Sequence, residues 1–133
     1  MEIKKNDLPN EKAESRERYE NICFSEFSSV HSKCPHTVTL EHFVRRVMSD
    51  EFKCHVKHYR MLLSQSGQEA EARKAKNATP AISPSTICFG GHAATDIQQY
   101  SGIVCIDLDH TDRRTDEIKR LASELPYVLA VII

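Results

Sequence analysis

The feature that most constrains the fold of this chain is an apolar run at residues 103–109 that ends in two closely spaced carboxylates. The run Ile-Val-Cys-Ile-Asp-Leu-Asp follows a glycine and is apolar at nearly every position before the first acid. A strand that is apolar on both faces is typical of a covered, central position in a sheet. Because alternate side chains of a strand share a face, Asp107 and Asp109 are expected on one face, about 7 Å apart along the chain.

Two like charges at the end of a buried strand are costly unless a cation or basic side chains neutralise them. Carboxylate oxygens are the ligands that hard divalent cations prefer. We therefore expect Asp107 and Asp109 to bind one or two divalent cations. His110, Arg113 and Arg114 follow directly and could contact phosphate groups. The structural alternative is that the two acids are solvated and cap the next helix, while the basic loop offsets nearby acids.

Length and composition limit the class of protein. The chain has 133 residues, 40% of them apolar, which fits one domain with a single core. Its formal net charge of −1 neither demands nor excludes a nucleic-acid partner. The sequence has no apolar stretch long enough to span a membrane, and its first residues lack the hydrophobic region expected of a signal peptide. The five cysteines are an odd number and include no Cys-x-x-Cys pair. These features predict a protein of the cytoplasm with reduced thiols and no membrane contact.

We divide the chain into a disordered arm over residues 1–18 and one domain over residues 19–133. Its N-terminal half is expected to contain a strand at residues 19–27 and then three helices. The first begins after a Thr39 cap, the second runs from about Phe52 to residue 64 or 65, and the third, at 67–77, is a solvated helix or a hinge arm. Two prolines predict a loop over residues 79–85. The apolar stripe of the first helix is Leu40, Phe43, Val44, Val47 and Met48.

The C-terminal half is expected to alternate strands and helices. A short strand at residues 86–89 and one or two helical turns at 94–100 precede the strand at 103–108. A helix then opens at Thr115 with acids in its first turn and ends at Pro126, before a last strand at 127–133. Residues 102–133 thus predict a βαβ unit with a right-handed crossover and its acidic pair where such folds bind ligands. The buried stripe of this helix is Ile118, Leu121, Ala122 and Leu125.

In this order of features the chain resembles the N-terminal domain of virulence-associated protein E-like proteins of bacterial mobile elements, a branch of the primase-polymerase superfamily. The resemblance covers about residues 21–133. It rests on the sequences TVTLE at 37–41, PAISPS at 80–85, YSGIVCIDLDH at 100–110 and LPYVL at 125–129.

The resemblance implies an α+β fold: a partial RRM-like primase-polymerase core with a helical N-terminal half and a C-terminal βαβ unit. It also implies that Asp107 and Asp109 are catalytic and bind Mg²⁺ or Mn²⁺ for nucleotidyl transfer in DNA replication. Nucleic acid, nucleotides and a helicase domain are the implied partners.

The sequence also departs from that family. There, the strand matching residues 128–133 leads into a further strand with a histidine and later a third acid. We therefore expect a domain truncated at its C-terminal end and inactive by itself, even if its parent is an enzyme. The alternative is a non-catalytic module that binds nucleic acid or a partner helicase. Arg45, Arg46 and the basic cluster at 73–76 could then follow a nucleic-acid backbone.

Two further hypotheses use neighbouring residues. The run from Asp107 to Thr111 is similar to the D-x-D-x-T element of haloacid dehalogenase-like phosphatases, in which the first acid is a nucleophile. That family needs a long α/β domain after the element, and only 22 residues follow Thr111. A zinc site is the second hypothesis, although the spacing matches no known structural pattern. Its possible ligands are Cys34, His36, Cys54 and His58.

The cation hypothesis predicts that Mn²⁺ binds the chain through the acidic pair. Isothermal titration of Mn²⁺ should give a binding heat for the wild type, and Asp107→Asn/Asp109→Asn should abolish it, because amides replace the charged ligands. Circular dichroism of both proteins provides the folding control. Equal heats from two folded proteins would contradict the cation site.

Overall fold

The computed structural model describes residues 21–108, 111–125 and 128, which form two compact units divided between Ile103 and Val104. Asp109 and His110, the arm expected at 1–18 and nearly all of the strand expected at 127–133 lie outside the described residues. The single domain over 19–133 stays a prediction. Each unit is described by itself below.

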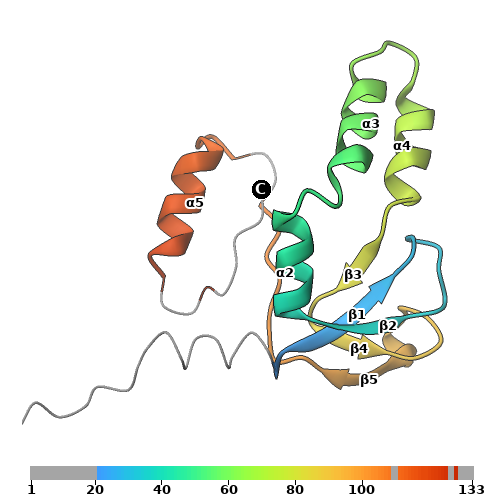
Figure 1. Cartoon of the computed structure of the whole chain (residues 1–133), viewed down its shortest axis with the longest axis vertical. Helices are drawn as coiled ribbons and strands as arrows, with labels where there is room; N and C mark the ends of the chain where they lie inside the picture. The colour runs from blue at the N-terminus through green and yellow to red at the C-terminus, as the bar shows by residue number, and fades with distance from the viewer. Residues whose placement is uncertain (1–20, 109–110, 126–127, 129–133) are drawn as a thin grey trace, which may run out of the picture. The chain divides into compact units, whose positions relative to one another are not determined.

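The part of the first unit described from Ile22 onward contains two small antiparallel sheets and three α-helices (Figure 1). One sheet has the strand order β2-β1-β3, and the other pairs β4 with β5. None of the helices described is long and apolar enough to cross a membrane. The elements are β1 (Cys23–Phe27), β2 (His36–Thr39), α2 (Leu40–Met48), α3 (Lys53–Leu63), α4 (Glu69–Asn77), β3 (Ala81–Ser83), β4 (Thr86–Cys88), the 3₁₀ turn η1 (Ala94–Asp96) and β5 (Ile97–Tyr100).

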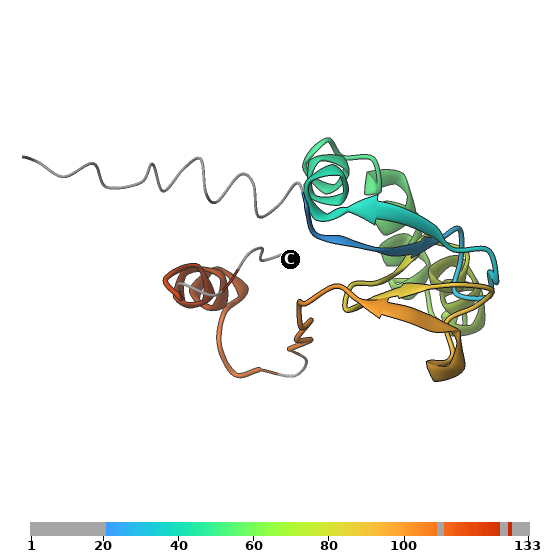
Figure 2. The ribbon, with the colours of Figure 1, turned by 90° about the horizontal axis from the view of Figure 1, so that it is seen from below.

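Strand β1 is the centre of this unit because it is covered on both faces. On one face Phe24 meets Phe43 of α2 edge-on, with ring centroids 5.7 Å apart. On the opposite face the Ser25 hydroxyl accepts a hydrogen bond of 2.8 Å from the backbone N–H of Cys88 in β4. Figure 2 shows α2 and the β4–β5 hairpin on opposite sides of the β1 sheet. Four successive residues of β1, from Phe24 to Phe27, are therefore buried.

Helix α2 begins and ends where its sequence predicts. The Thr39 hydroxyl accepts a hydrogen bond of 3.1 Å from the backbone N–H of His42, which satisfies a free donor of the first turn. Leu40 is buried, whereas Met48, at the end of the expected apolar stripe, is exposed. After the helix, Asp50 adopts a φ of 62°, a left-handed conformation that aspartate tolerates better than most residues. The chain turns there into α3.

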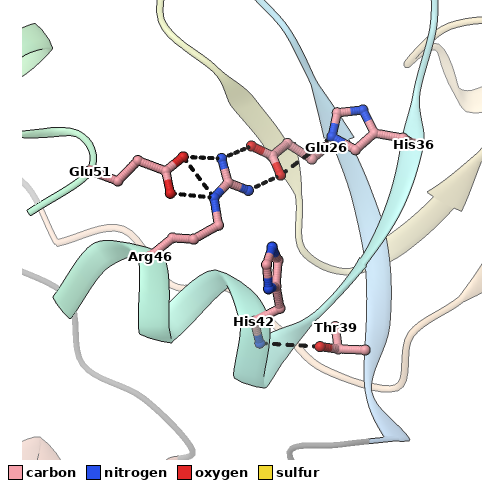
Figure 3. Close-up of polar contacts among 6 residues, drawn as sticks. All are labelled: Glu26, His36, Thr39, His42, Arg46 and Glu51. Carbon is pink, nitrogen blue, oxygen red and sulfur yellow. Dashed lines mark hydrogen bonds and ion pairs between the residues drawn. The ribbon is translucent and has the colours of Figure 1, made fainter. Parts of the chain in front are cut away.

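A buried carboxylate joins α2 to the sheet. Glu26 lies on the α2 face of β1 with only 2% of its side chain exposed. Arg46 of α2 donates two hydrogen bonds to it, of 2.5 and 2.9 Å, and two more, of 2.8 and 3.0 Å, to Glu51 (Figure 3). The Arg46 guanidinium also stacks over the ring of Phe52 at 5.1 Å. His36 of β2 approaches the same Glu26 carboxylate at 3.5 Å.

Helices α3 and α4 pack against each other as a hairpin that extends beyond the sheets in Figure 1. Gly67, with a φ of 83°, allows the tight turn between them. Ala72 of α4 is buried, and α3 has no buried residue. The hairpin therefore has little core and a large exposed surface, as expected for the solvated helix predicted at 67–77.

Three short strands were not expected from the sequence. Strand β3 lies within the expected Pro80–Pro84 loop, and it tolerates the flanking prolines because it is at the sheet edge. Residues 94–100 form only the turn η1 before continuing as β5, which pairs with β4. Strand β2 is the third. Strands of three or four residues are too short to show a reliable alternation of apolar and polar residues. Whether they form therefore depends on the strands with which they pair.

The second unit contains helix α5 (Thr115–Ser123), which confirms the helix predicted to open at Thr115. None of its residues is buried, and its least exposed side chains are Ile118, Leu121 and Ala122 of the expected stripe.

The expectation of a buried central strand at 103–108 is wrong: the segment has no strand structure. Its apolar side chains Val104, Ile106 and Leu108 are 84%, 76% and 60% exposed. A strand is stable only when its backbone groups pair, and no described residue pairs with residues 104–108. Without this strand the described residues form no βαβ unit. The coarser expectation of an α+β fold is confirmed, and the RRM-like core is not established by these strands.

Removing Arg46 should destabilise the first unit severely. Arg46→Leu leaves the buried Glu26 carboxylate with only the His36 imidazole nearby, at a cost of about 3–5 kcal/mol in the free energy of unfolding. Arg45→Leu is the matched control, because Arg45 forms an exposed pair with Glu41 that contributes at most about 1 kcal/mol. Urea unfolding would measure both. Adding Glu26→Leu to Arg46→Leu should recover stability, and equal costs for the two single variants would contradict the buried-pair account.

Acid should weaken the same cluster through Glu51. The hydrogen bond from Arg46 lowers the pKa of Glu51 below its ordinary value. A carboxylate with a lower pKa in the folded state stabilises that state above the unfolded pKa of about 4.3, and the contribution is lost as pH falls through the folded value. Urea unfolding from pH 7 to pH 3 should show Glu51→Gln converging on the wild type at acidic pH. A constant difference would contradict the linkage.

Candidate functional site

The α3–α4 hairpin concentrates positive charge in a chain that is slightly negative as a whole. Residues 53–77 contain six lysines and arginines and only two glutamates, a net charge of +4 against −1 for the whole chain. All six cationic side chains belong to exposed residues of the two helices. The hairpin is therefore a basic projection from a unit whose remaining charge is negative.

The position of the cations in α3 follows from its packing. Tyr59 and Leu62 are the least exposed residues of this helix, so they mark its inner side. Lys57 precedes Tyr59 by two residues, which places it about 200° around the helix, and Arg60 lies three residues after Lys57 on the same side. Two cations of α3 thus share the outer, solvent-facing side.

Ion pairing separates the six cations into two groups. Lys53 pairs with Asp50 at 2.6 Å and Lys74 pairs with Glu71 at 2.7 Å, and these hydrogen bonds raise the pKa of both lysines. The other four make no ion pair with any residue that the structure describes. They are Lys57, Arg60, Arg73 and Lys76, called the free cations of the hairpin below.

Basic residues elsewhere in the described chain are mostly paired. Arg45 pairs with Glu41 one turn earlier in α2. Arg46, which the sequence offered as a nucleic-acid contact, is enclosed by two glutamates, which raise its pKa further through hydrogen bonds. Outside the hairpin, only Lys33 and Lys119 lack an ion pair within the described ranges. The hairpin is thus the main exposed surface with unpaired positive charge in the described chain.

A shallow cleft of about 340 Å³ lies at the C-terminal end of α4, beside the β1–β2 loop. The backbone N–H of Val30 in this loop donates a hydrogen bond of 3.2 Å to the Asn77 carbonyl. The Val30 carbonyl contacts His92 Nε2 at 3.0 Å, and the His92 ring meets Phe27 edge-on. The loop is therefore held against α4 and against the core. The residues that line the cleft are Ser29, His31, Lys74, Asn77 and Ala78.

The residues predicted to bind cations and phosphate lie in the second unit. Asp107 is exposed and belongs to no strand, while its expected partners Asp109 and His110 lie outside the described residues. Arg113 donates a hydrogen bond of 3.1 Å to Glu117, and Arg114 pairs with Asp116 at 3.0 Å. Both pairs are exposed. Such pairs are weak, so they leave these arginines able to exchange partners.

No three metal-ligating side chains come together anywhere in the described ranges. The proposed zinc ligands Cys34, His36, Cys54 and His58 all belong to those ranges and form no such group. The cation site at Asp107 and Asp109 stays a prediction from the sequence, because one of its two carboxylates is not described.

The sequence-based site missed Lys57 and Arg60 of α3 and the cleft residues Ser29 and His31. The net charge of residues 53–77 was a usable signal for the first two, because a long run without acids is readable before folding. No feature of the neighbouring sequence indicated the cleft residues. Their position depends on a loop that packs against a helix more than 40 residues later in the chain.

A family model described as "BT4734-like, N-terminal domain" matches residues 74–133, less than half of the chain. The matched part runs from the end of α4 through β3, β4 and β5 to α5, and it includes Asp107, Arg113 and Arg114. Of the free cations of the hairpin it contains only Lys76. No curated protein and no solved structure matches the chain.

This finding corrects the family resemblance drawn from the sequence. The matching family is different from that of virulence-associated protein E-like proteins, so that assignment is wrong for this chain, and the primase-polymerase and replication functions inferred from it lose their support. The four short stretches behind the assignment are weak evidence, since apolar runs that end in D-x-D occur in unrelated proteins, as the phosphatase element shows. One of them, at 37–41, lies outside the matched region.

Proposed function

We propose that this protein is a non-catalytic module that binds nucleic acid through the α3–α4 hairpin. The observation that carries the proposal is the exposed group of four free cations in a projection with a net charge of +4. Elsewhere in the described chain, charge is largely neutralised by local ion pairs. The proposed setting is the cytoplasm, where the free cysteines would stay reduced.

Nucleic acid suits this surface for a physical reason. Lysine and arginine side chains that neutralise phosphates release condensed counterions, and this release drives sequence-independent binding. An unpaired cation supplies the full benefit, whereas Lys53 and Lys74 must first leave a carboxylate. A helix pair with a small core can also present both of its outer sides to a ligand. The surface therefore supports non-specific contact with a phosphate backbone.

Four free cations set the expected strength of binding. If each neutralises one phosphate, the slope of log K against log salt should be about −3.6 for duplex DNA and about −2.8 for a single strand. Affinity at physiological salt should fall in the non-specific range of roughly 10⁻⁴ to 10⁻⁶ M. Fluorescence anisotropy with a labelled 20-nucleotide single strand and the matching duplex, between 25 and 200 mM NaCl, measures both quantities.

A matched pair of double variants tests the surface itself. Lys57→Gln/Arg60→Gln should bring the salt slope closer to zero by about two and weaken binding at least tenfold at 100 mM salt. Lys119→Gln/Arg120→Gln removes the same charge from the exposed helix α5 and should leave affinity within about threefold of the wild type. Circular dichroism verifies that both fold.

Three outcomes would contradict the proposal. The first is no binding by the wild type at 25 mM salt. The second is equal loss in the two double variants, which would mean that only total charge matters. The third is equal binding to polyglutamate of the same length, which would indicate an acidic protein surface, such as that of a partner helicase, as the ligand.

A further inference from the structure

Four of the five residues that line the cleft beside α4 carry polar side chains. The side chains of Ser29, His31 and Asn77 make no hydrogen bond within the part of the chain that the structure describes. The fourth polar group, the Lys74 ammonium, pairs with Glu71, which does not line the cleft. The residues that line this space thus carry a hydroxyl, an imidazole, an ammonium and an amide.

Several backbone acceptors around the cleft are already occupied. The Asn77 carbonyl accepts from Val30, and the Lys74 carbonyl accepts from Ala78. The Lys76 carbonyl accepts from both the backbone and the hydroxyl of Thr79. These carbonyl oxygens are therefore engaged in hydrogen bonds within the protein. The four polar side chains that remain for a ligand can each donate a hydrogen bond, and one of them is cationic, which suits an anion with several oxygens.

We propose that this cleft binds a phosphate group of the nucleic acid that the hairpin holds. The inference rests on the proposed function, and it adds a specific phosphate site to a diffuse basic surface. Lys74 connects the two, because it follows Arg73 and precedes Lys76 in α4. The volume of about 340 Å³ is within the range of small-ligand sites, so a phosphate with its attached sugar can enter.

The Lys74–Glu71 pair is no obstacle to this role. It is an exposed pair three residues apart in a helix, with 74% of the lysine side chain exposed, and such pairs are weak. A phosphate that also accepts from Ser29 and His31 offers the ammonium more than the single carboxylate does.

Neutralising one lysine at a time tests the site against a close control. Lys74→Gln should weaken oligonucleotide binding at least fivefold and bring the salt slope closer to zero by about one. Lys53→Gln is matched, since Lys53 also pairs with an acid three residues away in the same hairpin but does not line the cleft. It should change affinity less than twofold. Equal effects of the two variants would overturn the inference.

A second variant removes donors without removing a lysine or arginine. Ser29→Ala/His31→Gln should lower affinity about threefold to tenfold while leaving the salt slope unchanged, because the cations remain. A folded variant with wild-type affinity would overturn the site. Comparing the affinity for the same oligonucleotide with a 5′-phosphate or a 5′-hydroxyl shows whether the bound phosphate is terminal or internal. A preference for the first that the variant loses identifies a terminal phosphate, and an equal loss with both identifies an internal one.

Inorganic phosphate separates failure of this inference from failure of the proposed function. At constant ionic strength, phosphate but not chloride should shift the NMR signals of Ser29, His31 and the Asn77 side-chain amide in the wild type. Unmoved signals would overturn the cleft site, even if the hairpin binds DNA. Shifted signals together with no oligonucleotide binding would uphold the cleft as a phosphate site and contradict the proposed function alone.

Discussion

The buried carboxylate of Glu26 is the constraint on which the arrangement of the first unit depends. A charge at the centre of a strand that is covered on both faces must be paired, and Arg46 donates two hydrogen bonds to it. Because Arg46 belongs to α2, the pair fixes that helix over the β1 face. The same guanidinium also holds Glu51, just before α3, so one side chain determines where the hairpin starts.

This anchoring explains how the proposed interface can be so exposed. The core of the unit lies between α2, β1 and the β4–β5 hairpin, where Phe24, Phe27 and Cys88 are buried. The α3–α4 hairpin contributes little to that core beyond Ala72. Its outer residues are therefore free of packing constraints, and cations there cost the fold almost nothing. Stability and the proposed binding surface are thus located in different parts of the same unit.

Local patterns predicted the helices well, because capping and an apolar period of 3.6 residues act within one segment. Thr39 caps α2 and Gly67 turns the chain into α4, as their residue types indicate. The short strands were missed for the converse reason, since β3 exists through its pairing with β1, more than 50 residues away. The prediction of a strand at 103–108 was wrong for the opposite reason. This segment has the composition of a buried strand, but no described neighbour pairs with it.

The same distinction between local and tertiary effects applies to the candidate site. The sequence by itself determined the helices, their polarity and the excess of positive charge over residues 53–77, because these are properties of neighbouring residues. Only the tertiary structure decided which cations are available. Arg46 and Lys57 look alike in the sequence, yet one neutralises a glutamate 20 residues away and the other faces solvent. Tertiary structure also formed the cleft, because its donors come from a loop and a helix that only folding brings together.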